Sequence, residues 1–210
     1  MAADTELIWA RRVAIIGAVL GWAGLVLQYG LLVQDMGGWG EALWRFVGYF
    51  TLLTNLWVTL VFTNAALRPA KRTGLGGPRM VFAATVAILL VGIVYTVALR
   101  SLWTPEGLTA VADHIVHDAM PVLCALFWWL QPHGRIGWRE ALWALAWPSG
   151  YFVYAMARGA FDGWYAYWFL NPTGMPAAEM ALSVGLLLLG VLVLAQVLAG
   201  LDRMLGGQGT

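Results

Sequence analysis

The chain has 210 residues, of which 61% are hydrophobic and 11% are charged. Soluble domains contain about 25% charged residues, so this composition indicates an integral membrane protein and excludes an ordinary soluble enzyme. The net charge of +1 gives no reason to expect a nucleic-acid partner, and the single cysteine, Cys124, excludes an internal disulfide and most thiolate metal sites.

Six segments are long and apolar enough to cross a bilayer as helices of roughly 20 residues. They cover residues 12–33, 44–67, 80–100, 111–131, 140–160 and 177–200. No soluble domain remains outside them. The expected fold is therefore all-α: one transmembrane domain over residues 1–210, a polytopic membrane protein with six transmembrane helices.

The basic residues predict the orientation of these helices. Most of them flank the first segment or lie in the loops after the second, fourth and sixth: Arg11, Arg12, Arg68, Lys71, Arg72, Arg79, Arg135, Arg139 and Arg203. By the positive-inside rule both termini are expected to be cytoplasmic, in a cell (inner) membrane. The opposite side then holds the aromatic-rich loop 160–176, which is either an interfacial belt or a lid that contacts substrate.

The fourth segment carries four ionisable residues, Asp113, His114, His117 and Asp118, where it enters the membrane. Such residues are costly in lipid, so a functional role is the default hypothesis. Residues four apart share a helix face, so Asp113 can pair with His117 and His114 with Asp118.

The second segment places Thr51, Thr54 and Asn55 on or beside one small, polar face. Such residues often act only as hydrogen-bonding contacts between membrane helices. The expected depth of Thr51 favours a functional role as well. At 1.5 Å per residue, Thr51 is about 10 Å below Trp44, and His117 is about 9 Å below the start of its segment. A hydroxyl and an imidazole are thus expected at similar depth.

The fifth segment adds Tyr151, Tyr154 and Arg158 at helical spacing. Arg158 is expected to snorkel to the headgroups, or else to hold Asp113, Asp118 or a substrate carboxylate. Prolines inside two segments, Pro121 and Pro148, each free a backbone carbonyl and bend the helix, which makes room for a cavity.

Three stretches together resemble bacterial six-pass relatives of the androgen-induced, androgen-dependent TFPI-regulating membrane protein family. The resemblance covers the second to fifth segments, and the order and spacing of the motifs are its strongest part. The stretches are Tyr49-Phe50-Thr51-Leu52-Leu53-Thr54-Asn55-Leu56, then His114-x-x-His117 followed by Pro121, then Gly150-Tyr151, Arg158-Gly159, Gly163-Trp164-Tyr165 and Phe169-Leu170.

Eukaryotic members of that family are transmembrane threonine hydrolases that cleave fatty acid esters of hydroxy fatty acids. The resemblance therefore implies Thr51 as the nucleophile, His117 as the base, and a lipid or fatty acid ester substrate, with membrane lipids around it and no cofactor. Two positions depart from the animal proteins: Thr54 replaces an acidic residue and is a competing nucleophile, and Asp118 replaces a threonine.

The chemistry needs a base beside the hydroxyl, a group that orients the base, and donors for the oxyanion. Asp113 is placed to orient His117, while Asp118 more naturally reaches His114. The sequence does not choose among four candidate oxyanion donors: Asn55, Tyr151, Tyr154 and His114.

Three other interpretations remain open. His114, His117 and Asp118 would bind a divalent metal if another segment supplied further ligands, but no second His, Cys or acidic cluster is evident, so no metal is expected. A transporter or lipid-binding protein would use the Asp/His cluster for proton transfer. In a purely structural interpretation, the Asp/His pairs only close a polar core.

Overall fold

The computed structural model describes residues 2–69, 73–102 and 104–207, and side chains from residue 7 onward within these ranges. Two basic residues used for the orientation, Lys71 and Arg72, lie outside them. All the regular secondary structure in the described residues is helical. Its α-helices are α1 (Ala2–Met36), α2 (Trp39–Phe46), α3 (Phe50–Leu67), α4 (Pro78–Val94), α5 (Gly107–His114), α6 (Met120–Trp129), α7 (Trp138–Ala141), α8 (Ala146–Asp162) and α9 (Ala177–Gly206).

Five helices in the described ranges are long and apolar enough to cross a membrane: Leu7–Met36, Phe50–Leu67, Pro78–Leu102, Gly107–Trp129 and Ala177–Gly206. The prediction of an all-α, multi-pass membrane protein is thus confirmed. The segment 140–160 is helical but is not among the five, because a 3-10 turn, Leu142–Leu145, separates α7 from α8, which alone has 17 residues. Pro148 explains the interruption, since it cannot donate to the carbonyl four residues earlier and its ring crowds that carbonyl.

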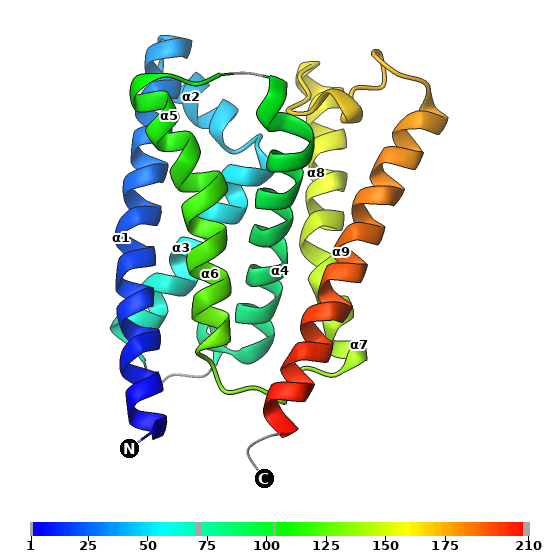
Figure 1. Ribbon diagram of the computed structural model, residues 1–210. Helices are drawn as coiled ribbons and strands as arrows, with labels where there is room; N and C mark the ends of the chain where they lie inside the picture. The colour runs from blue at the N-terminus through cyan, green and yellow to red at the C-terminus, as the bar shows by residue number, and fades with distance from the viewer. Residues whose placement is uncertain (1, 70–72, 103, 208–210) are drawn as a thin grey trace.

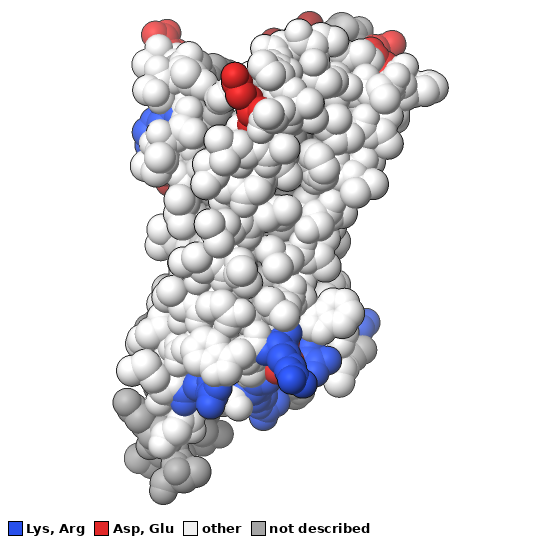
Figure 2. Space-filling view, turned by 90° about the vertical axis from the view of Figure 1, so that its right-hand side faces the viewer, with Lys and Arg blue, Asp and Glu red and all other residues white. Residues whose placement is uncertain are grey.

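The long helices lie side by side, and α1 begins at the same end of the bundle where α9 ends (Figure 1). We call this end the terminal end and the opposite one, which carries α2, the α2 end. On the face shown in Figure 2, most Lys and Arg side chains gather at the terminal end and most Asp and Glu at the α2 end, with an uncharged band between them. This separation is the pattern that the orientation argument relies on.

The core lies between α1, α3, α4 and α6, where Phe62, Phe82 and Met120 are fully buried. α1 packs closely on α3 because Gly21 has no side chain. A Cβ there would collide with the Thr59 hydroxyl and the Met120 methyl group. Small residues are the usual means of bringing membrane helices close together.

The helix is interrupted between α2 and α3, at Val47–Tyr49, where one continuous helix was expected. Gly48 lies at the break, and a Cβ there would come within 2.5 Å of the Arg158 and Trp164 side chains. The break corrects the depth estimate for Thr51, which was counted along an unbroken helix from Trp44. Thr51 lies instead in the first turn of α3.

Two π-helical turns, Tyr95–Leu99 after α4 and Ile115–Ala119 between α5 and α6, widen their helices at the same level. In the second turn the N–H of Met120 donates to the carbonyl of Ile115, five residues back, directly before Pro121. Such turns free backbone carbonyls and re-aim side chains, and they are frequent at functional sites. Here they stack the rings of Tyr95 and His117 with centroids 3.8 Å apart.

Candidate functional site

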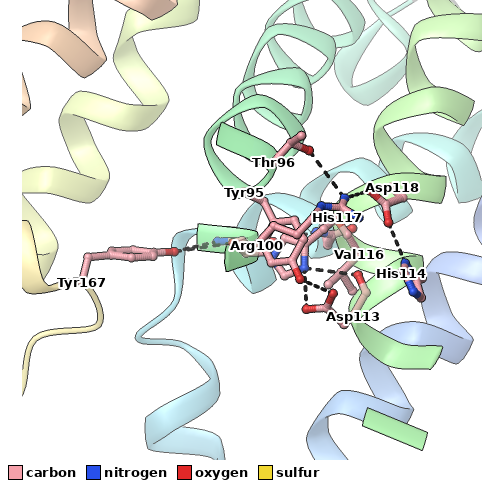
Figure 3. Close-up of polar contacts among 11 residues, drawn as sticks. Tyr95, Thr96, Arg100, Asp113, His114, Val116, His117, Asp118 and Tyr167 are labelled. Atoms are coloured by element: carbon pink, nitrogen blue, oxygen red, sulfur yellow. Dashed lines mark hydrogen bonds and ion pairs between the residues drawn. The ribbon is translucent and has the colours of Figure 1, made fainter. Parts of the chain in front are cut away.

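The buried carboxylate of Asp113 holds two aromatic side chains in place (Figure 3). Its Oδ1 lies 3.1 Å from Nδ1 of His117, and its Oδ2 accepts a hydrogen bond of 2.5 Å from the Tyr95 hydroxyl. The Tyr95 ring lies nearly parallel to the His117 imidazole, at 11°. We call Asp113 and His117 the inner pair.

The contacts of His117 define its tautomer. Nδ1 faces two acceptors on Asp113, the carboxylate at 3.1 Å and the main-chain carbonyl at 3.2 Å. Neither acceptor can donate, so Nδ1 carries the hydrogen in the neutral ring and Nε2 presents a lone pair. An imidazole in this state is ready to accept a proton.

The second predicted pair, which we call the outer pair, also forms. Nδ1 of His114 lies 2.7 Å from Oδ2 of Asp118, and the Arg100 guanidinium contacts the other carboxylate oxygen. Arg100 also lies over the Tyr95 ring, 4.9 Å from its centroid. Because the two histidines bind different carboxylates, they do not converge on one ion. Among the described residues, no group of three or more His, Cys, Asp or Glu side chains is arranged to hold a metal.

Thr51 and the inner pair line one cavity of about 380 Å³, which we call the His117 cavity. The Thr51 hydroxyl lies 3.5 Å and its N–H 3.4 Å from the Tyr167 hydroxyl, which reaches in from the loop between α8 and α9, on the side opposite Asp113 in Figure 3. In the described structure Thr51 and His117 share this cavity without a hydrogen bond between them.

A smaller, apolar cavity adjoins the first, and we call it the α4–α9 slot. It has a volume of about 90 Å³ and is lined mainly by aliphatic and aromatic side chains of α4, α8 and α9. Thr51, Tyr95, Leu99 and Tyr167 line both cavities. Thr51 therefore stands where a cavity that contains a base meets one that is apolar.

Comparison of the chain with protein-family models, with curated proteins and with solved structures finds no match. The resemblance to the threonine hydrolases stays a prediction, and any functional interpretation rests on the side chains themselves.

Two of the predicted side chains on α3, Thr54 and Asn55, make hydrogen bonds that link α3 to neighbouring segments. Thr54 is fully buried and accepts a 2.9 Å hydrogen bond from Nε1 of Trp147. Asn55 donates through Nδ2 to the carbonyls of Thr51, at 2.9 Å, and Val116, at 3.1 Å, and so links α3 to the π-helical turn. Both N–H groups of the Asn55 amide are therefore engaged with main-chain carbonyls, an arrangement that suits helix packing better than the predicted role as an oxyanion donor.

The predicted roles of Tyr151, Tyr154 and Arg158 are also corrected. The two phenols donate to the carbonyls of Gly48, at 2.8 Å, and Val47, at 3.1 Å, and Arg158 donates to the carbonyl of Trp44. Arg158 is buried and neither snorkels nor contacts Asp113 or Asp118. These residues donate hydrogen bonds to the main-chain carbonyls that the interruption between α2 and α3 leaves without helical partners. Because the sequence predicted an unbroken helix there, it gave no reason to expect that such donors were needed.

His114, the remaining oxyanion candidate, is exposed and paired with Asp118, outside the His117 cavity. Tyr95 and Tyr167 line the site, but neither was among the predicted site residues. Tyr95 shares the outer half of its segment with Arg100, which was a usable signal, whereas nothing distinguishes Tyr167 from the other aromatic residues of its loop. Burial raises the pKa of Tyr167, so its hydroxyl stays protonated and can donate.

Proposed function

We propose that this protein is a membrane-embedded lipid-ester hydrolase in which Thr51 is the nucleophile and His117 the general base. One observation carries the proposal: Thr51, His117 and Asp113 line the same cavity, and Asp113 fixes the imidazole so that Nε2 is free. A threonine hydroxyl needs such a base to become nucleophilic. Small shifts on substrate binding commonly close contacts that are long in the free enzyme.

The inner pair has a defined role in this reaction. His117 accepts the proton from Thr51 as the hydroxyl oxygen attacks the ester carbonyl, and it then passes that proton to the departing alcohol. The carboxylate of Asp113 stabilises the imidazolium that forms between these steps. Tyr95 holds Asp113 through its hydroxyl and covers one face of the imidazole through its ring.

The developing oxyanion would meet two kinds of donor beside Thr51. One is the Tyr167 hydroxyl, within 3.5 Å of the Thr51 side chain. The other is the set of N–H groups in the first turn of α3, where the N-cap residue, Tyr49, makes no capping hydrogen bond through its own side chain. Donors fixed in place before reaction are a large source of catalysis in acyl transfer.

The proposed setting is a cell (inner) membrane crossed six times, with both termini cytoplasmic. Two observations support it. The basic side chains gather at the terminal end, and the path through α7, the 3-10 turn and α8 returns the chain along the bundle between α6 and α9 (Figure 1). The cavities then lie toward the opposite leaflet, from which a lipid ester would enter.

Hydrolysis by the purified protein tests the nucleophile. We expect Thr51→Ala to abolish turnover of lipid esters, Thr51→Ser to retain a substantial part of it, and Thr54→Ala, one turn away on the same helix, to remain active. Size-exclusion elution in detergent checks that each variant is folded. Full activity of Thr51→Ala, or loss only in Thr54→Ala, would contradict the assignment.

One observation favours the alternative, a non-enzymatic protein that transfers protons. Thr51, Asn55, Thr59 and Thr63 follow one another at four-residue spacing along α3. The buried Asn55 Oδ1 and Thr59 Oγ1 have no hydrogen-bond partner among the described atoms. Proton flux into vesicles that contain the protein, lost in Asp113→Asn, would support this alternative over hydrolysis.

A further inference from the structure

The two cavities that meet at Thr51 distinguish the two parts of an ester substrate. This step rests on the proposed function. The leaving alcohol must take its proton from His117, and His117 lines the His117 cavity but not the α4–α9 slot. The alcohol part therefore lies in the His117 cavity, and the acyl part extends from the Thr51 hydroxyl into the slot.

The slot accepts only an apolar group. Its walls include Val91, Phe152, Val184 and Leu188, and none of its lining residues is charged. Two of the three phenols that border it are engaged elsewhere: that of Tyr151 donates to the Gly48 carbonyl, and that of Tyr95 donates to Asp113. The third, that of Tyr167, lies at Thr51, where the ester carbonyl would sit. A polar or charged acyl group would lose its hydration there without gaining partners.

The slot is also small. Its volume is about 90 Å³, whereas an engineered cavity of about 150 Å³ holds benzene, with its six carbons. The same ratio of volume to carbon gives roughly four carbons. The His117 cavity, at about 380 Å³, has room for a much larger group, and its lining includes the polar residues Gln28 and Asp113 beside aliphatic side chains.

We infer that the substrate is a short-chain acyl ester of a bulky amphiphilic alcohol, with an acyl chain of about two to four carbons held in the α4–α9 slot. The Thr51 oxygen bonds to the acyl carbon as the bond from that carbon to the alcohol oxygen breaks, and the Thr51 proton leaves with the alcohol through His117. Water, deprotonated by His117, then attacks the acyl carbon. The bond from that carbon to the Thr51 oxygen breaks, His117 returns the proton to that oxygen, and the short carboxylic acid leaves.

A chain-length series tests this inference. The detergent-purified protein would be assayed with p-nitrophenyl acetate, butyrate, octanoate and palmitate, with Thr51→Ala as the background. We expect kcat/KM to be highest for acetate or butyrate and to fall about 10-fold or more at octanoate, since even one methylene too many in an apolar site costs at least that much. Hydrolysis that depends on Thr51 but prefers octanoate or palmitate would overturn the inference and leave the hydrolase proposal standing. Absence of Thr51-dependent hydrolysis for every ester would overturn both.

Substitutions in α9 test whether the α4–α9 slot determines the preferred acyl chain length. Leu188→Ala enlarges the slot and should move the preferred chain length toward octanoate, while Leu186→Ala, a lipid-facing leucine two residues away, should leave it unchanged. Val184→Phe fills the slot and should depress butyrate turnover more than acetate turnover. An unchanged chain-length profile in both slot variants, each folded by size-exclusion elution, would overturn the assignment.

Discussion

The inner and outer Asp/His pairs arise from one sequence pattern but occupy different environments. In the inner pair, the side chains of His117 and Asp113 are 15% and 4% exposed, whereas those of His114 and Asp118 in the outer pair are 63% and 37% exposed. Both pairs are four residues apart: Asp113 and His114 end α5, and His117 and Asp118 lie in the π-helical turn that follows. Spacing alone therefore predicts that the pairs form, but the environment decides what each can do.

Burial gives the inner pair its chemical value. Its carboxylate is screened from water and accepts from both Tyr95 and His117, so the orientation of the imidazole is fixed. The outer pair shares its carboxylate with Arg100, and all three side chains are partly exposed on the outside of the bundle, away from the His117 cavity. We expect catalysis to depend on the inner pair and to tolerate changes in the outer one.

The largest expected difference separates the two histidines. His117→Ala removes the base and should lower kcat/KM for ester hydrolysis on the order of 1,000-fold. The matched change on the outer pair, His114→Ala, should alter it by less than about threefold, because an exposed ion pair contributes little. Steady-state assays of both variants, checked for folding by circular dichroism, make the comparison. Equal losses would contradict the division of roles.

A smaller difference should separate the two carboxylates. Asp113→Asn preserves shape but weakens control of the His117 tautomer, and we expect a loss in kcat of about 100-fold or more, by analogy with the orienting carboxylate of serine proteases. Asp118→Asn should retain nearly full kcat. If Asp113→Asn kept wild-type kcat across the pH range, Asp113 would not orient the base.

The free energy of unfolding should also depend more on the inner pair than on the outer pair, although the expected differences are smaller. Tyr95→Phe removes the donor to Oδ2 of the buried Asp113 and should lower the free energy of unfolding by about 1–3 kcal/mol. Asp118→Ala should cost less than about 1 kcal/mol. Thermal unfolding in detergent measures both, and a larger effect for Asp118→Ala would reverse the comparison.

A third carboxylate, Asp162 at the end of α8, gives the smallest effect. The N–H of Trp164, the indole of Trp44 and the Arg158 guanidinium hold the pKa of Asp162 below its ordinary value. Because the folded-state pKa is the lower one, the stabilisation is present above the unfolded pKa, near 3.9, and is lost as pH falls through the folded value. Asp162→Asn should thus lower Tm at pH 7 and match the wild type at low pH. A constant difference in Tm from pH 7 to pH 3 would contradict this account.

Much of the fold followed from composition and periodicity. Long apolar segments predicted α1, α3, α4 and α9 as spanning helices, because lipid requires every backbone group to be satisfied within the helix. The break at Val47–Tyr49 was missed because the side chains that satisfy its carbonyls, such as Tyr151 and Arg158, come from a region a hundred residues away. The sequence around residues 47–49 does not indicate hydrogen-bond partners that come from so far along the chain.

The candidate site was predictable to a similar degree. Helical spacing predicted the contact of Asp113 with His117, and the resemblance pointed to Thr51 as the nucleophile. Tyr167 was not predictable, since only the path of its loop brings its hydroxyl to Thr51. The burial that distinguishes the inner from the outer pair likewise depends on helix packing, because the same residue types occur at the same spacing in both.

The most direct test of the central claim is to label the purified protein with a fluorophosphonate probe and locate the adduct by peptide mass spectrometry. The account predicts an adduct on Thr51 that is lost in His117→Ala and retained in His114→Ala. An adduct on Thr54 or on any other residue, or no adduct on folded wild-type protein, would contradict it.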